Sequence, residues 1–424
     1  MHVLSLLCAV ALPAIVSAFP NAPFVTEAQW IHDSTGENFT YVGVNWPGAG
    51  EVMIPEGLQY QSVASIASKI KSLNMNVVRL TFAIEMIDDI EDNGGDVTLQ
   101  DAFKTALGNE NGTIIYQQVI KNNPQFGPST TRLQVYDNIA AELAKQQIYV
   151  HLDNHMSKGA WCCSLTDGNA WFGDTYFDVE KWKRGLRYMA EHVGNPPATS
   201  AQLANTDLQS KQWPNMVSIG LRNEFRQPAV AGNSLPYNWP TWYEQNVAAA
   251  DIVNAANPDI LIFFSGLNYD TTLQPIPGGD DLGNGQRFLL TDFTYADKMV
   301  LEMHNYQNSA TNCGDIEGGL WNNGFRATSG NNVNTMPVLL TEFGFSQADN
   351  SYNSVYATCL RKLMPQWKSG WQVWALGGSY YIRSGIQDYE ETWGLFNHDW
   401  TAWRNEAAIT ALKGMVDATL ASVQ

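Results

Sequence analysis

Short apolar, β-branched runs alternate with longer amphipathic stretches along most of the chain. Such runs are typical of buried strands, whereas apolar residues spaced three and four apart are typical of helices. The eight runs are Tyr41–Trp46, Val77–Phe82, Ile148–Asp153, Met216–Leu221, Ile260–Phe264, Met299–His304, Val338–Glu342 and Trp371–Leu376. Helices are predicted over Leu58–Leu73, Thr131–Gln147, Asp178–Val193, Trp242–Ala256, Tyr352–Trp367 and Trp403–Leu420, with a weaker pattern over Asp315–Arg326. No helical pattern lies between Phe264 and Lys298, so the fifth unit is expected to be irregular.

This alternation predicts an α/β fold, a (β/α)8 TIM barrel with long βα loops, because such barrels range from about 250 to over 400 residues. A doubly wound parallel sheet is the alternative, and it usually carries a G-x-G-x-x-G turn after its first strand. Gly43, Gly48 and Gly50 do not have that spacing. No linker and no internal repeat divides the chain. We therefore expect residues 19–424 to form a single domain.

Residues 1–18 have the pattern of a secretory signal peptide. The apolar stretch Val3–Val16 is too short to span a bilayer, and Val16-Ser17-Ala18 is a small-x-small cleavage site, although no Lys or Arg precedes the stretch. The alternative is a buried N-terminal strand or helix. No second stretch predicts a transmembrane helix, so we expect a secreted, soluble protein. The triplets beginning at Asn38 and Asn111 are N-glycosylation acceptors, expected in surface loops.

The cysteines agree with an extracellular location. Beyond Cys8 in the predicted signal, the chain has Cys162, Cys163, Cys313 and Cys359. An even number in a secreted chain indicates disulfides, and four cysteines allow three connectivities. We favour Cys313 with Cys359 and a bridge between the neighbours Cys162 and Cys163, both as structural staples. No C-x-x-C pair occurs, which argues against a zinc ribbon or a thioredoxin-type site.

Composition restricts the partners of the chain. Asp and Glu number 42 against 24 Lys and Arg, giving a net charge of −18. Such a field repels nucleic acid and anionic lipid, so neither is expected as a partner. Charged residues make up only 16% of the chain, whereas aromatic residues reach 12% and include 15 Trp. These numbers suit a neutral, ring-shaped ligand, but a Trp-rich core explains them equally well.

Polar residues gather where the predicted strands end, which in this barrel is where chemistry is located. They are Arg79, Asp153-Asn154-His155, Asn223-Glu224, His304-Asn305-Tyr306, Glu342 and Trp374. A carboxylate ending an apolar run costs several kcal/mol unless it is paired or functional. Two facing carboxylates, one protonated and one ionised, can cleave a glycosidic bond. Arg79 is suited to keep one of them ionised.

This set resembles the signature of glycoside hydrolase family 5. Asn45-Trp46 and Val77-Val78-Arg79-Leu80 are similar to secreted cellulases of that family, of the fungal endoglucanase type. The resemblance covers nearly all of residues 19–424 and implies a glycoside hydrolase catalytic domain. It also implies a retaining double displacement, in which Glu224 is the acid/base and Glu342 the nucleophile.

The resemblance implies further roles for the neighbouring positions. Asn223 is expected to bind the sugar 2-hydroxyl, and Arg79 and Tyr306 to orient Glu342 and hold it ionised. His155 and His304 are expected to contact the substrate and tune the acid/base. Trp374 is expected to form the platform under the sugar at the cleavage point.

Two segments depart from the family pattern. Glu85–Thr130 is a long insertion after the second run, and Trp161–Gly173 differs from the compact loops of many members. Both are expected to line the cleft, which leaves the substrate open. Candidate sugar-stacking residues are Trp46, Trp161, Trp171, Trp239 and Trp393, each with core packing as the alternative role.

Other kinds of site fit the sequence less well. His151, Asp153 and His155 share one face of a strand and could together bind a metal ion. A metal-dependent hydrolase would need further ligands on the fifth run, Ile260–Phe264, which has none. No G-x-S-x-G elbow indicates a serine hydrolase. We therefore expect no metal and no cofactor.

The expected partner is a neutral β-linked polysaccharide or oligosaccharide, bound by a monomer. Endo-1,4-β-glucanase is the first prediction, and β-mannanase or another β-glycan or β-glycoside hydrolase of the family stays open. A non-catalytic carbohydrate-binding barrel is the alternative from another class. The presence of both Glu224 and Glu342 argues against it, because a decayed site has no reason to keep both.

Overall fold

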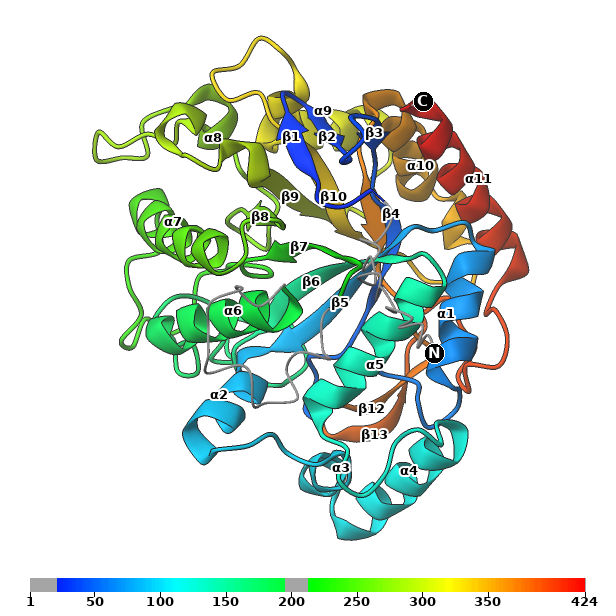
Figure 1. Cartoon of the computed structure of the whole chain (residues 1–424). Coiled ribbons are helices and arrows are strands. Elements are labelled where there is room, and N and C mark those ends of the chain that lie inside the picture. The colour runs from blue at the N-terminus through cyan, green and yellow to red at the C-terminus, as the bar shows by residue number, and fades with distance from the viewer. Residues whose placement is uncertain (1–20, 195–212, 424) are drawn as a thin grey trace, which may run out of the picture.

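The computed structural model describes residues 21–194 and 213–423, so the predicted signal peptide, 1–18, lies outside the described residues. Eight parallel strands close into a barrel with helices around it, which confirms the predicted (β/α)8 fold (Figure 1). The strands, in barrel order, are β4 (Val42–Trp46), β5 (Val77–Ala83), β6 (Tyr149–Met156), β7 (Met216–Gly220), β8 (Leu261–Ser265), β9 (Met299–Asn305), β10 (Val338–Phe343) and β11 (Trp371–Val373). Each corresponds to one predicted run.

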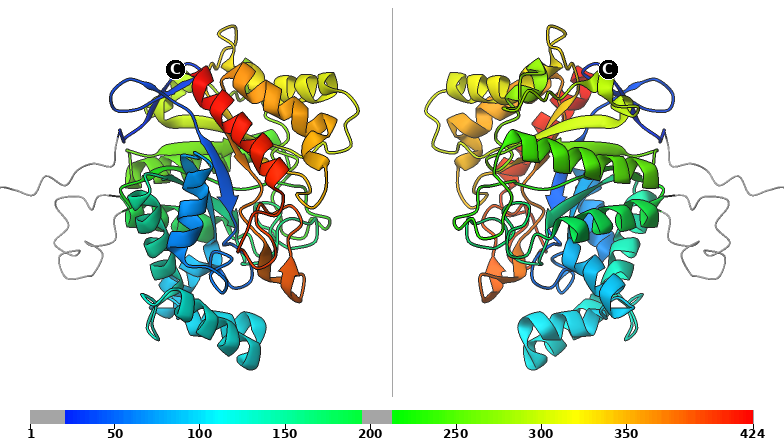
Figure 2. Two further views of the ribbon diagram at one scale, coloured as in Figure 1. Left: turned by 90° about the vertical axis from the view of Figure 1, so that its right-hand side faces the viewer. Right: turned by 90° about the vertical axis from the view of Figure 1, so that its left-hand side faces the viewer.

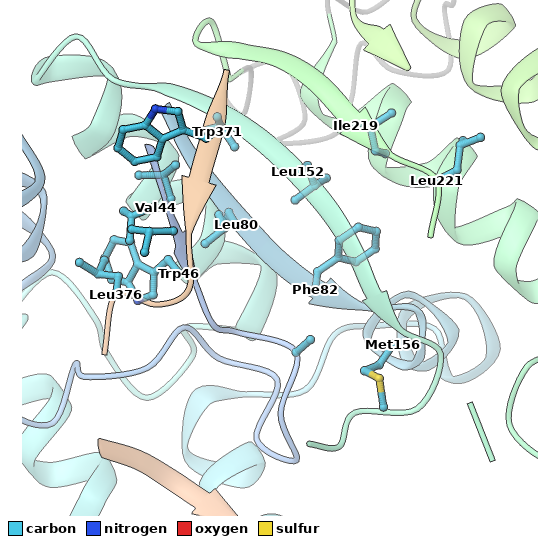
Figure 3. Close-up of a cluster of buried hydrophobic side chains, with 14 of the residues drawn as sticks. Val44, Trp46, Leu80, Phe82, Leu152, Met156, Ile219, Leu221, Trp371 and Leu376 are labelled. Carbon is cyan, nitrogen blue, oxygen red and sulfur yellow. The ribbon is translucent and has the colours of Figure 1, made fainter. Parts of the chain in front are cut away.

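Every residue of these eight strands is buried, as expected when helices cover the outside of a parallel barrel. Side chains alternate between the two faces along each strand. Leu80 and Phe82 of β5 belong to the main hydrophobic cluster, together with Leu152 of β6 (Figure 3). The residues that alternate with them, Arg79 and Thr81, are therefore directed to the barrel interior, which is polar toward the carboxyl ends of the strands.

The surrounding helices match the predicted amphipathic stretches. Their bounds are α1 (Val63–Ser72), α5 (Arg132–Lys145), α6 (Val179–Val193), α7 (Trp239–Ala256), α9 (Cys313–Asn323), α10 (Val355–Trp367) and α11 (Glu406–Ser422). Polar side chains cap their first turns: Ser62 caps α1, Asp178 caps α6, and Thr131 forms a capping box with Gln134 on α5. The fifth unit is irregular, as predicted, with only α8 (Pro275–Gly278) and the 3-10 turns Leu290–Asp292 and Ala296–Lys298. Further 3-10 turns cover Phe325–Thr328 and Ser351–Asn353.

A small antiparallel sheet at the amino-terminal end of the barrel strands was not predicted. It contains β1 (Val25–Glu27), β2 (Trp30–His32) and β3 (Asn38–Phe39). Phe24, fully buried before β1, packs 5.2 Å from the ring of Tyr149 at the start of β6. These aromatic residues belong to a second apolar cluster that fills the amino-terminal end of the barrel. The opposite end, where the polar residues lie, stays available for a site.

The insertion after β5 forms α2 (Ile84–Asn93), α3 (Leu99–Leu107) and α4 (Asn109–Asn122). A second addition, the hairpin of β12 (Ser379–Arg383) and β13 (Ile386–Glu390), follows β11. Phe103 of α3 packs 4.9 Å from Tyr381 of β12, and both views of Figure 2 place α3, α4 and the hairpin at the end opposite the N-terminal sheet. The insertion does not line the cleft, so that prediction was wrong: it supports the hairpin, whose residues do line it.

Both predicted glycosylation acceptors are exposed, but neither lies in a loop. Asn38 is in β3, and Asn111 is in α4, where its Nδ2 donates to Gln387 Oε1 of the hairpin at 2.7 Å. Among the described residues, no helix combines the length and the apolar character needed to cross a membrane.

The cysteines pair as favoured from the sequence. Cys313 begins α9 and Cys359 lies in α10, so this bridge joins two neighbouring helices with Cα atoms 5.3 Å apart, in the usual range for a disulfide. Cys162 and Cys163 are bridged to each other.

The two bridges should contribute very differently to stability. Cys313 and Cys359 are 46 residues apart, and closing a loop of that length in the unfolded chain is worth about 4 kcal/mol by the chain-entropy argument. The C313A/C359A variant is therefore expected to unfold several degrees below the wild type in differential scanning calorimetry. C162A/C163A should lose much less, because its bridge closes almost no loop. Equal losses in the two variants would contradict this difference.

Candidate active site

Arg79, the third residue of β5, is fully buried and joins side chains from several barrel strands. Its Nη1 donates to Glu342 Oε1 at 2.6 Å and to Asn45 Oδ1 at 2.9 Å. Its Nη2 donates to Asn223 Oδ1 at 3.0 Å and lies 2.9 Å from Asp153 Oδ1. Burial would lower the pKa of Arg79, but the carboxylates around it raise the pKa above its ordinary value. The guanidinium is therefore a permanent positive charge at the centre of the site.

Two further carboxyl groups lie beneath it. Burial would raise the pKa of Asp153, but Arg79 and a 2.7 Å hydrogen bond with His155 Nδ1 lower it to about 2. Glu302 lies farther away, with its Oε2 3.8 Å from Arg79 Nη2, and burial raises its pKa to about 7. Thr341 Oγ1 donates to the same oxygen of Glu302 at 2.8 Å. Asp153 is thus an ionised partner of Arg79, whereas Glu302 can take up a proton near neutral pH.

Glu342, the penultimate residue of β10, is held by two donors. Arg79 binds one carboxylate oxygen, and the Tyr306 hydroxyl donates to the other at 2.9 Å. Burial, followed by the charge of Glu342, raises the pKa of Tyr306 well above its ordinary value, so the phenol keeps its proton and remains a donor. Both contacts stabilise the ionised carboxylate and fix its orientation.

Glu224 follows β7 and differs from Glu342 in its surroundings. Its φ of 49° is in the left-handed region, which is uncommon for a residue other than glycine. Its backbone N–H donates to Asp270 Oδ2 at 2.7 Å, and its carbonyl oxygen accepts from Arg226 Nη1 at 2.9 Å. Its side-chain Oε1 lies 3.0 Å from His304 Nδ1. Burial raises the pKa of Glu224 to about 7, so this carboxyl is protonated below neutral pH.

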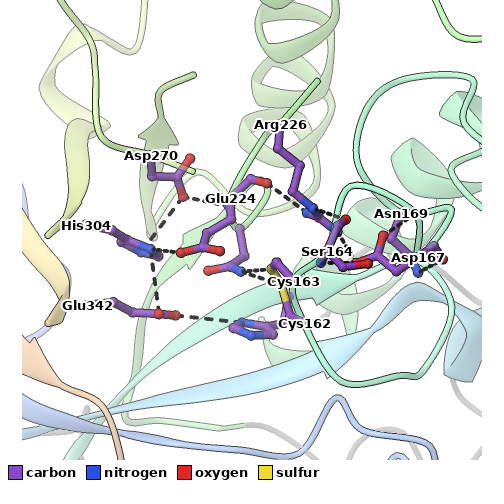
Figure 4. The surroundings of a disulfide bond; sticks show 12 residues. Cys162, Cys163, Ser164, Asp167, Asn169, Glu224, Arg226, Asp270, His304 and Glu342 are labelled. Carbon is purple, nitrogen blue, oxygen red and sulfur yellow. Dashed lines mark hydrogen bonds and ion pairs between the residues drawn. A yellow bond between two sulfur atoms is a disulfide. The ribbon is translucent and has the colours of Figure 1, made fainter. Parts of the chain in front are cut away.

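Both glutamates lie beside the imidazole of His304, whose Nδ1 is 3.0 Å from Glu224 Oε1 and 3.6 Å from Glu342 Oε2 (Figure 4). One carboxylate oxygen of each and a ring nitrogen of His304 all lie within 4.8 Å of one another. Burial lowers the pKa of His304 to about 4, so the ring is neutral at pH 7. The site therefore pairs a carboxyl that holds its proton with a carboxylate bound to a cation.

These groups lie in a cleft of about 680 Å³ at the carboxyl ends of the barrel strands. Trp374 stacks on His155 with ring centroids 5.4 Å apart and an angle of 10° between the planes. Trp161 is covered by the Arg383 guanidinium of β12, whose Cζ lies 3.5 Å from the ring centroid. Trp393 lines the same cleft. Aromatic faces and hydrogen-bonding groups thus surround the two glutamates.

The sugar-stacking candidates divide into two groups. Trp161 and Trp393 line the cleft, and sugar stacking stays a prediction for both. Trp46 and Trp171 are fully buried, so that prediction was wrong for both. Trp46 Nε1 donates to the carbonyl oxygen of Glu56 behind the barrel wall, and Trp171 packs among other aromatic side chains. Trp239 does not line the cleft either: it packs against Trp242 at the start of α7.

Several site residues were missed from the sequence. Asp270 and Arg226 fix the backbone of Glu224, and both lie in loops whose conformation has no sequence pattern. Burial raises the pKa of Asp270 well above its ordinary value. Tyr389 and Glu391 line the cleft from the hairpin and the segment after it. The aromatic and β-branched run Tyr380-Tyr381-Ile382 could have indicated a strand there.

The alternative metal-binding interpretation of His151, Asp153 and His155 does not fit their contacts. His151 Nδ1 is 2.8 Å from Ser218 Oγ deep in the barrel, and burial lowers the pKa of His151 to about 3. Asp153 is engaged by Arg79 and His155. In the described part of the chain, these three residues are not among the groups close enough to share one ion.

A closed (β/α)8 barrel with two facing glutamates at the carboxyl ends of its strands defines a glycosidase. Comparison with known proteins gives the same class. The family model "Cellulase (glycosyl hydrolase family 5)" matches residues 32–379. A "Glycosyl hydrolase 5 family protein" from Chamaecyparis obtusa is 32% identical over 423 residues, which is 97% of this chain and 69% of the relative. The chain belongs to glycosyl hydrolase family 5.

Solved structures share the fold at low identity. An endocellulase from Pyrococcus horikoshii in complex with cellotetraose is 16% identical, with a TM-score of 0.65, over 93% of this chain and 98% of that chain. The catalytic domain of the major endoglucanase from Xanthomonas campestris pv. campestris is 16% identical, with a TM-score of 0.62, over 93% of this chain and 99% of that chain.

Removing the Arg79 cation should strongly destabilise the protein. Arg79→Met leaves buried carboxylates without their partner, and breaking such a pair from one side costs about 3–5 kcal/mol. Urea unfolding at pH 7 measures the loss. It should shrink as the pH falls, because Asp153, whose pKa rises without Arg79, becomes neutral and no longer needs a cation.

Arg184→Met is the matched control. Arg184 also binds two carboxylates, Asp88 and Asp92, but these three side chains are 20–42% exposed. A surface pair of this kind contributes little to stability, so this variant should lose much less than Arg79→Met. Similar losses for the two variants at pH 7 would show that the buried network is not the stabilising feature we infer.

Proposed function

We propose that this protein is a secreted, retaining endo-1,4-β-glucanase. The observation that carries the proposal is the pairing of Glu224 and Glu342 in an aromatic cleft, with one carboxylate oxygen of each within 4.8 Å of the other. Retaining glycosidases have carboxyl groups about 5–5.5 Å apart, whereas inverting enzymes need about 6.5–9.5 Å to admit a water molecule. The short separation supports double displacement.

Glu342 is the nucleophile in this mechanism. Its carboxylate oxygen forms a bond to the anomeric carbon while the bond from that carbon to the leaving oxygen breaks. Arg79 and Tyr306 hold the carboxylate in one orientation, which leaves its electron pair directed into the cleft. A carboxylate already fixed in the attacking position loses little entropy when the sugar binds.

Glu224 acts first as the acid and then as the base. Its proton passes to the leaving oxygen in the first step, and a carboxyl with a pKa of about 7 retains that proton until it is needed. In the second step the Glu224 carboxylate takes a proton from water. The water oxygen then bonds to the anomeric carbon, and Glu342 is released as a carboxylate.

The cleft supports a neutral glycan as substrate. Trp374, Trp161 and Trp393 offer flat apolar faces to pyranose rings, while Asn223 and His155 offer hydrogen bonds. The structurally similar endocellulase from Pyrococcus horikoshii was crystallised with cellotetraose, a β-linked glucan oligosaccharide. Two disulfides and the predicted signal peptide support an extracellular site of action.

A substrate panel tests this proposal. The wild type should release reducing ends from soluble β-1,4-glucan faster than from soluble mannan or xylan. The first product seen by proton NMR should be the β-anomer, because two displacements restore the configuration. Glu342→Gln should abolish turnover while cellotetraose binding, measured by calorimetry, persists. A first-formed α-anomer would exclude the retaining mechanism, and mannan as the best substrate would exclude the glucanase assignment.

The pH dependence should report Glu224. Because burial raises its pKa to about 7, the acid is protonated below that pH and loses its proton as the pH rises through it. The kcat/KM for an unactivated oligosaccharide should therefore fall above about pH 7. With a dinitrophenyl glycoside, whose departure needs no proton, Glu224→Ala should show no such fall. A fall that persists in Glu224→Ala would assign it to another group.

A further inference from the structure

The Cys162–Cys163 disulfide lies in the wall of the cleft, in the loop between β6 and α6 (Figure 4). Both cysteines are half-buried. Their sulfur atoms and one carboxylate oxygen of Glu224 all lie within 4.8 Å of one another. This bridge is therefore part of the site around the acid/base and does not act only as a structural crosslink.

Stability does not explain a bridge at this position. A disulfide stabilises a protein mainly by restricting the unfolded chain, and the effect grows with the length of the loop that it closes. Cys162 and Cys163 are adjacent in sequence, so their bridge restricts almost nothing beyond the two residues themselves. The contacts of the sulfur atoms point to a different role.

Both sulfur atoms contact the side-chain amide of Asn223. Its Nδ2 lies 3.5 Å from Cys162 Sγ and 3.8 Å from Cys163 Sγ. Arg79 fixes which way this amide points: a guanidinium carries only donors, so the Asn223 atom 3.0 Å from its Nη2 must be the acceptor Oδ1. The NH2 group then faces the bridge and the cleft. An amide NH2 group carries two N–H groups, so it can contact sulfur with one and a ligand with the other.

A buried arginine holds the bridge and the glutamate together. Arg226, 1% exposed, donates from Nε to the carbonyl oxygen of Ser164 at 2.8 Å and from Nη2 to Asp167 at 2.5 Å. The same guanidinium donates from Nη1 to the carbonyl oxygen of Glu224. The loop that carries the sulfur atoms is thus tied to the segment that carries Asn223 and Glu224. Neither can shift without the other.

We propose that the Cys162–Cys163 disulfide is a positioning group that orients the Asn223 amide toward the sugar at the cleavage point. Asn223 and Glu342 both accept from Arg79, so the amide lies beside the nucleophile, within reach of the substituent next to the anomeric carbon, the 2-hydroxyl. The sulfur atoms hold the amide from the opposite side. The inference rests on the proposed function, because it takes the cleft to bind a glycoside at Glu224 and Glu342.

The test compares kcat/KM for an aryl β-cellobioside and for its analogue that lacks the 2-hydroxyl at the cleavage point. The wild type should prefer the 2-hydroxy substrate. C162A/C163A should lower that preference about tenfold, the size of one lost hydrogen bond. C313A/C359A, which removes the other bridge, should leave the preference unchanged. In Asn223→Ala, adding C162A/C163A should lower it no further, because both changes remove the same contact.

Two results would overturn the inference. If C162A/C163A slows both substrates equally, the bridge only supports the fold of the loop. If it lowers the preference equally with and without Asn223, the bridge acts on the sugar by another route. Should C162A/C163A fail to fold, the preference is measured on folded C313A/C359A after phosphine reduction of its remaining bridge, confirmed by mass spectrometry. The same fall in preference is then expected, and an unchanged preference overturns the inference.

Failure of the proposed function would look different. If the wild type does not cleave the cellobioside, the glucanase assignment fails, and the same comparison is made with the aryl β-glycoside that it does cleave. The ratio between the 2-hydroxy and 2-deoxy substrates reports on Asn223 and the bridge, whichever sugar is preferred.

Discussion

Three carboxyl groups converge on the Arg79 guanidinium inside the barrel. In this buried interior, one positive charge cannot balance three negative charges. The distances show how the conflict is resolved. Glu342 and Asp153 lie 2.6 and 2.9 Å from the cation, whereas Glu302 lies 3.8 Å away. Burial and its acidic neighbours raise the pKa of Glu302 to about 7, so this group sheds its charge as the pH falls through neutral. The positive charge of Arg79 thus remains available to Glu342.

The same alternation of side chains that builds the barrel also produces this network. Along β5, Leu80 and Phe82 pack outward under the helices, so Arg79 and Thr81 must point inward. At the amino-terminal end the interior is apolar and is closed by Phe24 beneath Tyr149. Solvent therefore reaches the polar layer only from the carboxyl ends of the strands, and the strongest electrostatic interactions lie at the base of the cleft.

The barrel and the central site could be predicted from the sequence because both depend on short-range patterns. Each barrel strand is a short and largely apolar run. Arg79 interrupts one of these runs, Glu342 ends another, and Glu224 follows a third. The walls of the cleft could not be predicted in the same way. The hairpin β12–β13 takes its position from contacts with the insertion, such as Phe103 against Tyr381, across almost 280 residues of sequence.

The tryptophans show most clearly what the sequence cannot predict, because an indole ring suits a buried core and a platform under a sugar equally well. Trp46 and Trp161 are the same residue type near the same end of the barrel. Trp46 is the last residue of β4 and falls on the outward face, where it is fully buried under Glu56. Trp161 lies beyond the end of β6 in a loop, and Arg383 holds its ring at the cleft. Only the register of the strand and the path of the loop separate the two roles.

Glu224 and Glu342 are likewise one residue type with two different roles, and the groups around each carboxyl determine its role. Glu342 has a cation and a phenol as donors to its carboxylate. The carboxyl of Glu224 has a neutral imidazole beside it, and the nearby Arg226 is turned to its backbone carbonyl. Asp270 binds the backbone N–H of Glu224 and holds the residue at its positive φ. The protein thus fixes the main chain of Glu224 firmly while leaving its side chain without a cation, which is the environment in which a carboxyl keeps its proton.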